Sequence, residues 1–371
     1  MTITQSSVLD ALKALLYSAS QPPDTSLTHL LLVDYLLTDP ALPDTSHKRR
    51  IALNRLLTTT IRDALTHFRR IHHLTVPSAE HDLAKARCQI TDDAATQSAE
   101  LLTVSWMYYR YVRVDLDITP DTYSAWAGVD DRTLRRYHKH GVKRLTDTLI
   151  HREWRLGQEQ RKLRLLTALP VTRLPHLYGR DLLLQHIEDL LPNAQPHHLQ
   201  ITGAPGIGKT ALTHEVVRRL IDQHCLDDLI WFDEPESIRC VYDRLEALAT
   251  PVAIRDYLLR YRVMVVIDNA HQLDLDRLNA VLKALSTAYV IVVNRHYLPL
   301  STALPCVAVP PIPEADAKTY IRAVNESQYP GYEHRLSDQE VDRLWREVGG
   351  HPIRIRQTIT ALWEALGEES A

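Results

Sequence analysis

A glycine-rich run of eight residues, Gly203 to Thr210, separates a short apolar segment from a segment with helical periodicity. Glycines let the backbone turn tightly and point consecutive N–H groups at phosphate oxygens, while a lysine reaches the β and γ phosphates and a hydroxyl binds Mg²⁺. The run Gly-Ala-Pro-Gly-Ile-Gly-Lys-Thr places these groups at the required spacing. The sequence therefore predicts a phosphate-binding loop between a strand at 198–202 and a helix at 209–221.

The cofactors expected for this loop are ATP or ADP together with Mg²⁺. The N-terminus of the following helix adds its dipole to phosphate binding. The residues predicted to bind the nucleotide are Gly203, Ala204, Pro205, Gly206, Ile207, Gly208, Lys209, Thr210 and Ala211, with Thr210 also on the metal.

A second apolar segment supplies the carboxylate that such a site needs beside its Mg²⁺. Residues 263–267 are consecutive apolar residues, as expected of a parallel strand covered on both faces, and Asp268 follows them. We expect Asp268 to share the Mg²⁺ with Thr210. The alternative is that Asp268 only caps the next turn.

Asn269 stands directly after Asp268, where many ATPases have a glutamate that orients the attacking water. An amide cannot act as a base, so either hydrolysis is slow or another group, for which His271 is the candidate, positions the water. His271 equally fits a surface residue at the start of the next loop.

A third buried segment, 288–293, ends before Asn294 and Arg295, which are candidate sensors of the γ phosphate. Further strands are expected at 229–232 and 306–309. Helices are expected between strands at 237–248 and 276–286. This alternation predicts an α/β fold with a doubly wound, five-stranded parallel sheet and a nucleotide at its carboxyl edge.

Two flanking segments resemble the STAND branch of AAA-like ATPases, which includes NB-ARC proteins and related bacterial regulators. Tyr178, Gly179 and Arg180 match the entry motif that lies near the adenine in that family. Gly349-Gly350-His351-Pro352 resembles the motif of its helical lid, whose proline contacts the nucleotide, so the resemblance implies a contact for Pro352. The resemblance covers roughly residues 174–366.

The chain departs from this family in two respects. The family commonly has a second acidic residue where this chain has Asn269. It also usually continues into a winged-helix domain and repeat arrays that sense a ligand, whereas this sequence ends at Ala371. No built-in ligand sensor is therefore expected from the resemblance.

The segment 119–144 has the pattern of a helix-turn-helix. Thr119 and Pro120 form a helix start, Gly128 marks a turn, and apolar residues recur at the spacing of a trihelical core. The wider segment 101–153 is similar to the sigma-factor-like helical modules found ahead of some bacterial STAND ATPases. Residues 7–16, 29–37, 49–71 and 79–86 are expected to be further helices.

A second helix beginning at Asp131 would present a set of polar side chains to double-stranded DNA: Arg132, Thr133, Arg135, Arg136 and Lys139. Between Arg132 and Leu165 the chain has eleven Lys or Arg and three acidic residues, although its net charge is −3. This basic patch indicates a local nucleic-acid interface. The alternatives are protein contacts and a simply solvated face.

The length of 371 residues predicts two or three domains. We expect an all-helical N-terminal region at 1–95, a helix-turn-helix-like domain at 96–165, a linker at 166–175, an ATPase domain at 176–312 and a helical lid at 313–371. Four scattered cysteines without a CxxC pair favour free thiols and the cytoplasm. The sequence shows no leader and no membrane span.

Three functions remain open on the sequence alone. The first is an ATP-dependent regulatory switch, self-associating in its ATP state, whose nucleotide state controls DNA binding or self-association. The second is a DNA-remodelling AAA-type ATPase resembling the helper ATPases of transposition. The third is a signalling adaptor with a degenerate ATPase.

Overall fold

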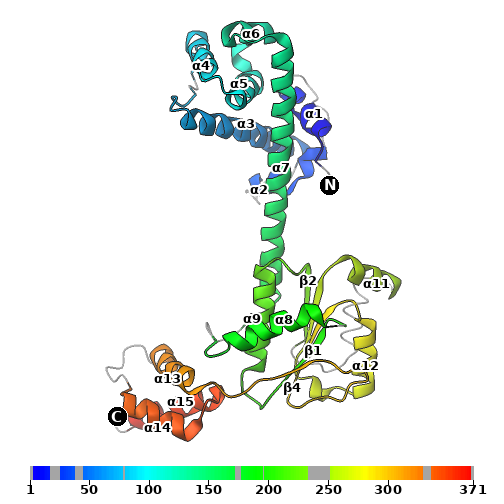
Figure 1. Ribbon diagram of the computed structural model, residues 1–371, viewed down its shortest axis with the longest axis vertical. Coiled ribbons are helices and arrows are strands. Elements are labelled where there is room, and N and C mark those ends of the chain that lie inside the picture. Colours follow the sequence, from blue (N-terminus) through cyan, green and yellow to red (C-terminus); the bar gives the residue numbers. More distant parts are fainter. Residues whose placement is uncertain are drawn as a thin grey trace. The chain divides into compact units, whose positions relative to one another are not determined.

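The computed structural model describes residues 3–16, 26–37, 45–77, 80–171, 177–194, 196–232, 251–328 and 336–368 (Figure 1). The chain divides into two compact units, unit 1 at Met1–Glu159 and unit 2 at Gln160–Ala371. The helix predicted at 237–248 lies outside the described residues. In the described ranges no helix is long and apolar enough to cross a membrane.

Unit 1 is built from helices packed around α5, which is buried on all sides, as expected of a helix with apolar residues all round. Its elements are α1 (Gln5–Leu16), η1 (Ser26–His29), α2 (Leu31–Leu36), α3 (Ser46–Ile71), α4 (Leu83–Ala95), α5 (Ala99–Tyr111), η2 (Val114–Leu116), α6 (Pro120–Ala127) and the first part of α7 (Asp131–Thr167).

The helix expected at 79–86 was placed wrongly, because α4 begins at Leu83 and continues to Ala95. The Asp82 side chain accepts hydrogen bonds from the backbone N–H groups of Ala84 and Lys85 and so fixes the start of the helix.

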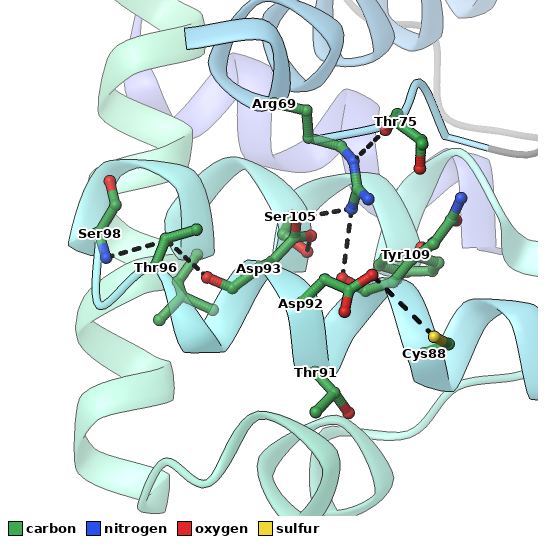
Figure 2. Close-up of polar contacts among 12 residues, drawn as sticks. Arg69, Thr75, Cys88, Thr91, Asp92, Asp93, Thr96, Ser98, Ser105 and Tyr109 are labelled. Atoms are coloured by element: carbon green, nitrogen blue, oxygen red, sulfur yellow. Dashed lines mark hydrogen bonds and ion pairs between the residues drawn. The ribbon is translucent and has the colours of Figure 1, made fainter. Parts of the chain in front are cut away.

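A buried ion pair joins α3 to α4 in the core of unit 1 (Figure 2). Arg69 and Asp93 are both fully buried, and Arg69 Nη1 donates to Asp93 Oδ1 over 2.6 Å. Ser105 of α5 donates to the other carboxylate oxygen over 2.7 Å, and Arg69 Nε donates to the Thr75 carbonyl. These bonds tie three helices together, while burial outweighs them and raises the pKa of Asp93 to about 6.

The predicted helix-turn-helix segment forms two helices joined by a short turn. Thr119 caps α6 by accepting a hydrogen bond from Thr122 N, and Gly128 adopts a left-handed conformation with φ of 65°. Tyr123 and Leu134 are buried between the helices and the rest of unit 1, as their spacing predicted.

Helix α7 contributes residues to both units. Its C-terminal turns belong to unit 2, where Arg161 forms an ion pair with Asp227 and Lys162 lies 2.8 Å from Asp222. Leu165 is buried in the core of unit 2. The segment at which a linker was expected therefore begins inside a helix, which ends at Thr167, and residues 172–176 of it lie outside the described ranges.

Unit 2 contains the predicted five-stranded parallel sheet, whose strand order in the structure is β2-β3-β4-β1-β5. The strands are β1 (His198–Thr202), β2 (Asp228–Phe232), β3 (Val263–Ile267), β4 (Tyr289–Asn294) and β5 (Cys306–Ala308). Helices α8 (Asp181–Asn193) and α9 (Lys209–Asp222) pack on one face. Helices α11 (Pro251–Arg260) and α12 (Leu275–Ala284) pack on the other.

Three C-terminal helices have a core of their own. They are α13 (Glu314–Gln328), α14 (Asp338–Val348) and α15 (Pro352–Glu368). Tyr320, Ile355 and Trp363 are buried among them, and Trp363 Nε1 donates to Asn325 Oδ1 over 2.7 Å. Ser337 and Glu340 form a reciprocal capping box at the start of α14.

Candidate nucleotide site

The predicted phosphate loop joins β1 to α9 through backbone conformations that favour glycine. Gly203, Gly206 and Gly208 have φ values of 151°, 75° and 101°. A Cβ atom on Gly206 would also lie 2.5 Å from Ile353 Cγ2, so a larger residue cannot be accommodated without movement. The loop is therefore specified by both its turns and the close approach of α15, and Ala211 follows in the first turn of α9.

Lys209 at the start of α9 folds back over the loop. Its ammonium group donates hydrogen bonds to the carbonyls of Gly203 over 2.9 Å and Ala204 over 3.0 Å. Burial lowers the pKa of Lys209, while the nearby Asp268 carboxylate raises it and the Arg295 charge lowers it further. A cation held over the loop by backbone carbonyls matches the lysine that binds phosphate oxygens in such loops.

Thr210 and Asp268 meet at the carboxyl edge of the sheet. Thr210 Oγ1 donates a hydrogen bond to Asp268 Oδ2 over 2.6 Å, and Asp268 is buried at the end of β3. A hydroxyl and a carboxylate are oxygen ligands of the type that Mg²⁺ accepts together with substrate phosphates. The residues thus fit the predicted metal site.

Asn269 occupies a left-handed backbone position with φ of 52°. Its N–H donates to Asp268 Oδ1 over 2.8 Å. Asparagine adopts this conformation more readily than glutamate. The turn after Asp268 is therefore one that asparagine fits well.

His271 is brought beside the loop and is half-buried in the 3₁₀ helix η3 (Ala270–Gln272). Burial lowers the pKa of His271 most strongly, followed by the positive charges of Arg295 and Lys209, while Asp268 opposes the shift. Its Nδ1 atom is buried and has no hydrogen-bond partner in the part of the chain that the structure describes. The lowered pKa favours the neutral ring, which is the form that can accept a proton from water.

Asn294 ends β4, which lies between β1 and β3, and it pairs with Thr202 in the sheet register. Its side chain bonds within its own loop, accepting from Arg295 N over 2.8 Å and donating to the His296 carbonyl over 2.7 Å. The Arg295 carbonyl accepts from Gly203 N, while its side chain is exposed. The structure thus brings both candidate sensors to the edge that holds the loop.

The Tyr178-Gly179-Arg180 segment links the loop to α13. Arg180 is 4% exposed, its guanidinium lies 3.4 Å from the Ile207 carbonyl, and burial lowers its pKa. A Cβ atom on Gly179, whose φ is 61°, would lie 2.6 Å from an Asp316 side-chain oxygen. The Tyr178 ring packs 5.3 Å from the ring of Tyr320.

The start of α15 lies against the tip of the phosphate loop. A Cβ on Gly350 would lie 1.9 Å from the Ile312 carbonyl oxygen, and Ile312 N donates to the Gly350 carbonyl over 2.7 Å. Pro352 is the first residue of α15, but it is its neighbours His351 and Ile353 that approach Gly206.

Sequence reasoning missed His351 and Ile353. Burial lowers the pKa of His351, with further lowering by Arg354, and within the described ranges its buried Nδ1 has no hydrogen-bond partner. The glycine pair before His351 was the available signal, because two glycines in succession indicate a close backbone approach.

The basic candidates on α7 face solvent while their apolar neighbours are buried. Arg132, Arg135, Arg136 and Lys139 are exposed. Thr133 is only partly exposed and serves the start of the helix, since its N–H and hydroxyl both bond to Asp130. The exposed candidates are therefore the four cations, and the exposed Asp131 side chain lies 4.0 Å from that of Arg135.

No protein-family model and no curated protein matches the sequence. Chains of three solved structures have a coarse likeness to this one. The first is from the E. coli MS115-1 HORMA:CdnC:Trip13 complex, at 16% identity and a TM-score of 0.35, covering 52% of this chain and 76% of that one. C. elegans PCH-2 has 13% identity and a TM-score of 0.31, covering 51% of this chain and 63% of its own.

The third is from the S. cerevisiae Hsp104:casein complex, with 16% identity and a TM-score of 0.38, covering 56% of this chain and 40% of that one. This chain therefore spans less than two thirds of the second and third structures. Because the identities and TM-scores are low, the site is described from the geometry of this chain alone. That geometry is an α/β fold with a phosphate-loop sequence between β1 and α9.

Proposed function

We propose that the protein is an ATP-binding, slowly hydrolysing molecular switch. The observation that carries the proposal is the 2.6 Å hydrogen bond between Thr210 Oγ1 and Asp268 Oδ2, next to the loop on which the Lys209 ammonium lies. When bound, Mg²⁺ would neutralise charge on the β and γ phosphates. Thr210 and Asp268 would hold the ion, and Lys209 would bind the phosphate oxygens.

Slow turnover follows from the group beside Asp268. Asn269 has no basic side chain, so general-base help is left to His271, whose neutral imidazole lies within the electrostatic reach of Lys209 and Asp268. With histidine as the general base in place of a carboxylate, we expect slow hydrolysis of ATP. The ATP-bound protein is then the long-lived state.

The C-terminal helices are the element that the nucleotide would bias. His351 and Ile353 pack on Gly206 of the loop, and Gly179 of the entry motif packs on Asp316 of α13. A nucleotide shifts a conformational equilibrium only by its differential affinity for the two states. Contacts that reach the phosphate loop from α15 provide such a difference, so we infer that α13–α15 act as a lid.

The output we infer is DNA binding by the exposed cations of α7, or nucleotide-dependent self-association. The basic patch is concentrated in a chain whose net charge is −3. The three described cysteines are free thiols, which supports the reducing cytoplasm as its location.

The second candidate function is a DNA-remodelling ATPase that assembles on DNA. Such an assembly commonly uses an arginine that reaches the γ phosphate of a neighbouring subunit. Here the Arg295 side chain is exposed, and its charge lowers the pKa of both Lys209 and His271 of its own chain. An adaptor with a degenerate site is disfavoured by the intact Lys209, Thr210 and Asp268.

Binding of a fluorescent ATP analogue in the presence of Mg²⁺ tests the nucleotide proposal. We expect wild-type protein to bind, Lys209→Ala to lose binding while remaining folded, and Lys283→Ala on the exposed face of α12 to bind as wild type. Unchanged affinity in Lys209→Ala contradicts the site. Binding to mixed-sequence duplex DNA with and without Mg-ATP, across a salt series, then separates the switch from the alternatives.

A concentration series distinguishes the two DNA-linked functions. A switch acting within one chain is expected to hydrolyse ATP at a specific rate independent of protein concentration. Cooperative DNA binding together with a specific rate that rises with protein concentration would favour the assembling ATPase. Absence of DNA binding in every nucleotide state would assign α7 to protein contacts.

A further inference from the structure

Unit 1 contains a cavity of about 310 Å³ between α3, α5 and α7. Its floor is formed by buried apolar side chains of all three helices: Ile61, Phe68, Val104, Met107 and Leu145. This volume and this apolar lining are those of a small-molecule site at the lower end of the usual size range. None of these residues belongs to the nucleotide site.

A close helix contact holds one end of the cavity. Gly141 of α7 packs so tightly on α5 that a Cβ atom there would lie 2.5 Å from Met107 Cγ. The cavity is therefore bounded at this end by two helices in direct contact. This close packing pre-forms the shape of the cavity.

Two arginines form the α7 wall of the cavity. Arg144, Thr148 and Arg152 follow one another at four-residue spacing and therefore line one side of the helix. The Arg144 guanidinium carbon lies 4.5 Å from the centroid of the Phe68 ring, and Arg152 Nη1 donates to Thr60 Oγ1 over 3.1 Å. Side chains of α3 thus hold both guanidinium groups at the cavity.

The two guanidinium groups retain capacity to bind an anion. In the described ranges Arg152 has no carboxylate partner, and the Arg144 pair with Glu100 is long, at 3.9 Å, and exposed. Asp63 is the one carboxylate among the described residues that line the cavity. Guanidinium groups form paired hydrogen bonds with carboxylate, sulfonate or phosphate oxygens. A bound anion would therefore supply acceptors for the two arginines.

A more open groove of about 690 Å³ continues from the cavity and shares Arg144, Thr148 and Arg152 with it. Lys143 and Arg155 add positive charge to this groove, and Glu100 and Asp147 add negative charge. Lys and Arg outnumber the carboxylates in both the groove and the cavity, and Arg144 and Arg152 are the cations that the two share. The anionic group is therefore placed at the shared arginines.

We propose that the cavity between α3, α5 and α7 binds a small organic anion, whose apolar body contacts the floor while its acidic group binds Arg144 and Arg152. This site is independent of the proposed nucleotide site. It gives unit 1 a ligand-binding function that its sequence motifs did not indicate.

Paired fluorescent dyes of similar shape test the proposal on the full chain. Anilinonaphthalene sulfonate carries the anionic group, and phenylnaphthylamine is its uncharged counterpart. We expect saturable binding of both, with the sulfonate weakened about tenfold or more by Arg144→Met/Arg152→Met and the neutral dye unaffected, because the variant removes charge-assisted hydrogen bonds. Arg55→Met/Arg62→Met, at exposed positions of α3 outside the cavity, is the matched control and should bind both dyes as wild type.

Filling the cavity provides the second measurement. Ala64 lines it, and Ala64→Phe is expected to weaken binding of both dyes at least tenfold while near-ultraviolet circular dichroism shows intact packing. Equal sulfonate affinity in wild type and the double arginine variant would overturn the proposal. So would undiminished binding of both dyes to folded Ala64→Phe. If Ala64→Phe fails to fold, the double variant Arg144→Met/Arg152→Met decides the question alone.

Discussion

Thr210 and Asp268 are 58 positions apart, yet the Thr210 hydroxyl donates a 2.6 Å hydrogen bond to Asp268 Oδ2. The contact exists because β1 and β3 run parallel on either side of β4, so the residues that follow them meet at one edge of the sheet. It places the two predicted Mg²⁺ ligands together before any ligand is considered.

Loss of either Mg²⁺ ligand should remove the effect of Mg²⁺ on nucleotide affinity. We expect Thr210→Ala and Asp268→Asn each to weaken Mg-ATP binding about tenfold or more, because each deletes an oxygen ligand or its charge. Titration of a fluorescent ATP analogue with Mg²⁺ and with EDTA measures the difference. Thr319→Ala, at an exposed position of α13, is the control, and a retained Mg²⁺ effect in both site variants would contradict the assignment.

The Gly350–Ile312 backbone contact should hold α15 against the phosphate loop. Gly350→Ala is expected to destabilise the protein by about 1–3 kcal/mol and to weaken nucleotide binding, because the added Cβ meets the Ile312 carbonyl. In Gly157→Ala of α7 the added Cβ meets Leu31 at an ordinary 3.6 Å, so this variant should stabilise by about 0.5–1 kcal/mol. Urea unfolding and nucleotide titration measure both, and equal behaviour of the two variants would refute the packing argument.

The buried Arg69–Asp93 pair should be sensitive to the loss of one partner. Asp93→Leu and Arg69→Met are each expected to lower the free energy of unfolding by about 3–5 kcal/mol, since one variant leaves a buried cation unpaired and the other a buried carboxylate. The double variant Arg69→Met/Asp93→Leu should recover much of the loss. Chemical denaturation, followed by a spectroscopic signal from unit 1, measures the free energy of unfolding of each variant. Losses that simply add in the double variant would argue against a coupled pair.

The exposed cations of α7 should control binding to DNA if this face is a nucleic-acid interface. Arg135→Glu/Arg136→Glu is expected to weaken duplex binding and to reduce the slope of log affinity against log salt by about 0.9 for each phosphate that is no longer neutralised. Fluorescence anisotropy across a salt series measures affinity and slope together. Arg55→Glu/Arg62→Glu on α3 carries the same charge change outside the patch, and an equal weakening in that control would show a net-charge effect only.

His198 should make stability depend on pH. Its ring is 1% exposed at the start of β1, with Nε2 3.0 Å from the Leu285 carbonyl, and burial lowers its pKa below the ordinary value of about 6.5. The unfolded chain therefore takes up the proton more readily than the folded chain, so the free energy of unfolding falls as the pH drops below about 6.5.

His198→Gln should reduce this slope between pH 7 and pH 5. The same substitution at exposed His186 of α8 is the control, and denaturant titrations at several pH values measure both. A slope that stays unchanged in His198→Gln would assign the pH dependence to other groups.

Local patterns were enough to predict the sheet and the phosphate loop. The strands β3 and β4 read as apolar runs because they are covered on both faces, whereas β1 was recognised as the short segment that enters the loop. Gly203 to Thr210 has the spacing that its backbone turns demand. The start of α6 was equally readable, since a capping threonine followed by proline acts on the next turn only.

Contacts between distant segments were not readable in this way. Nothing in the local sequence indicates that His351 and Ile353 pack on Gly206, or that Arg69 is buried against Asp93. The contact of Pro352 with the nucleotide came from a family motif and stays a prediction, whereas the approach of its neighbours His351 and Ile353 to Gly206 is seen only in the structure. Side-chain partners of this kind depend on how helices pack, which periodicity does not specify.

The sequence by itself determined the five strands of unit 2, the loop that turns between β1 and α9, and the acid that follows β3, because each depends on residues close along the chain. Tertiary structure alone decided which of these residues meet, that α7 continues to Thr167, and that α3, α5 and α7 enclose a cavity lined by Arg144 and Arg152. The physical reason is that backbone preferences act over a few residues, whereas burial and close packing join residues from any part of the chain.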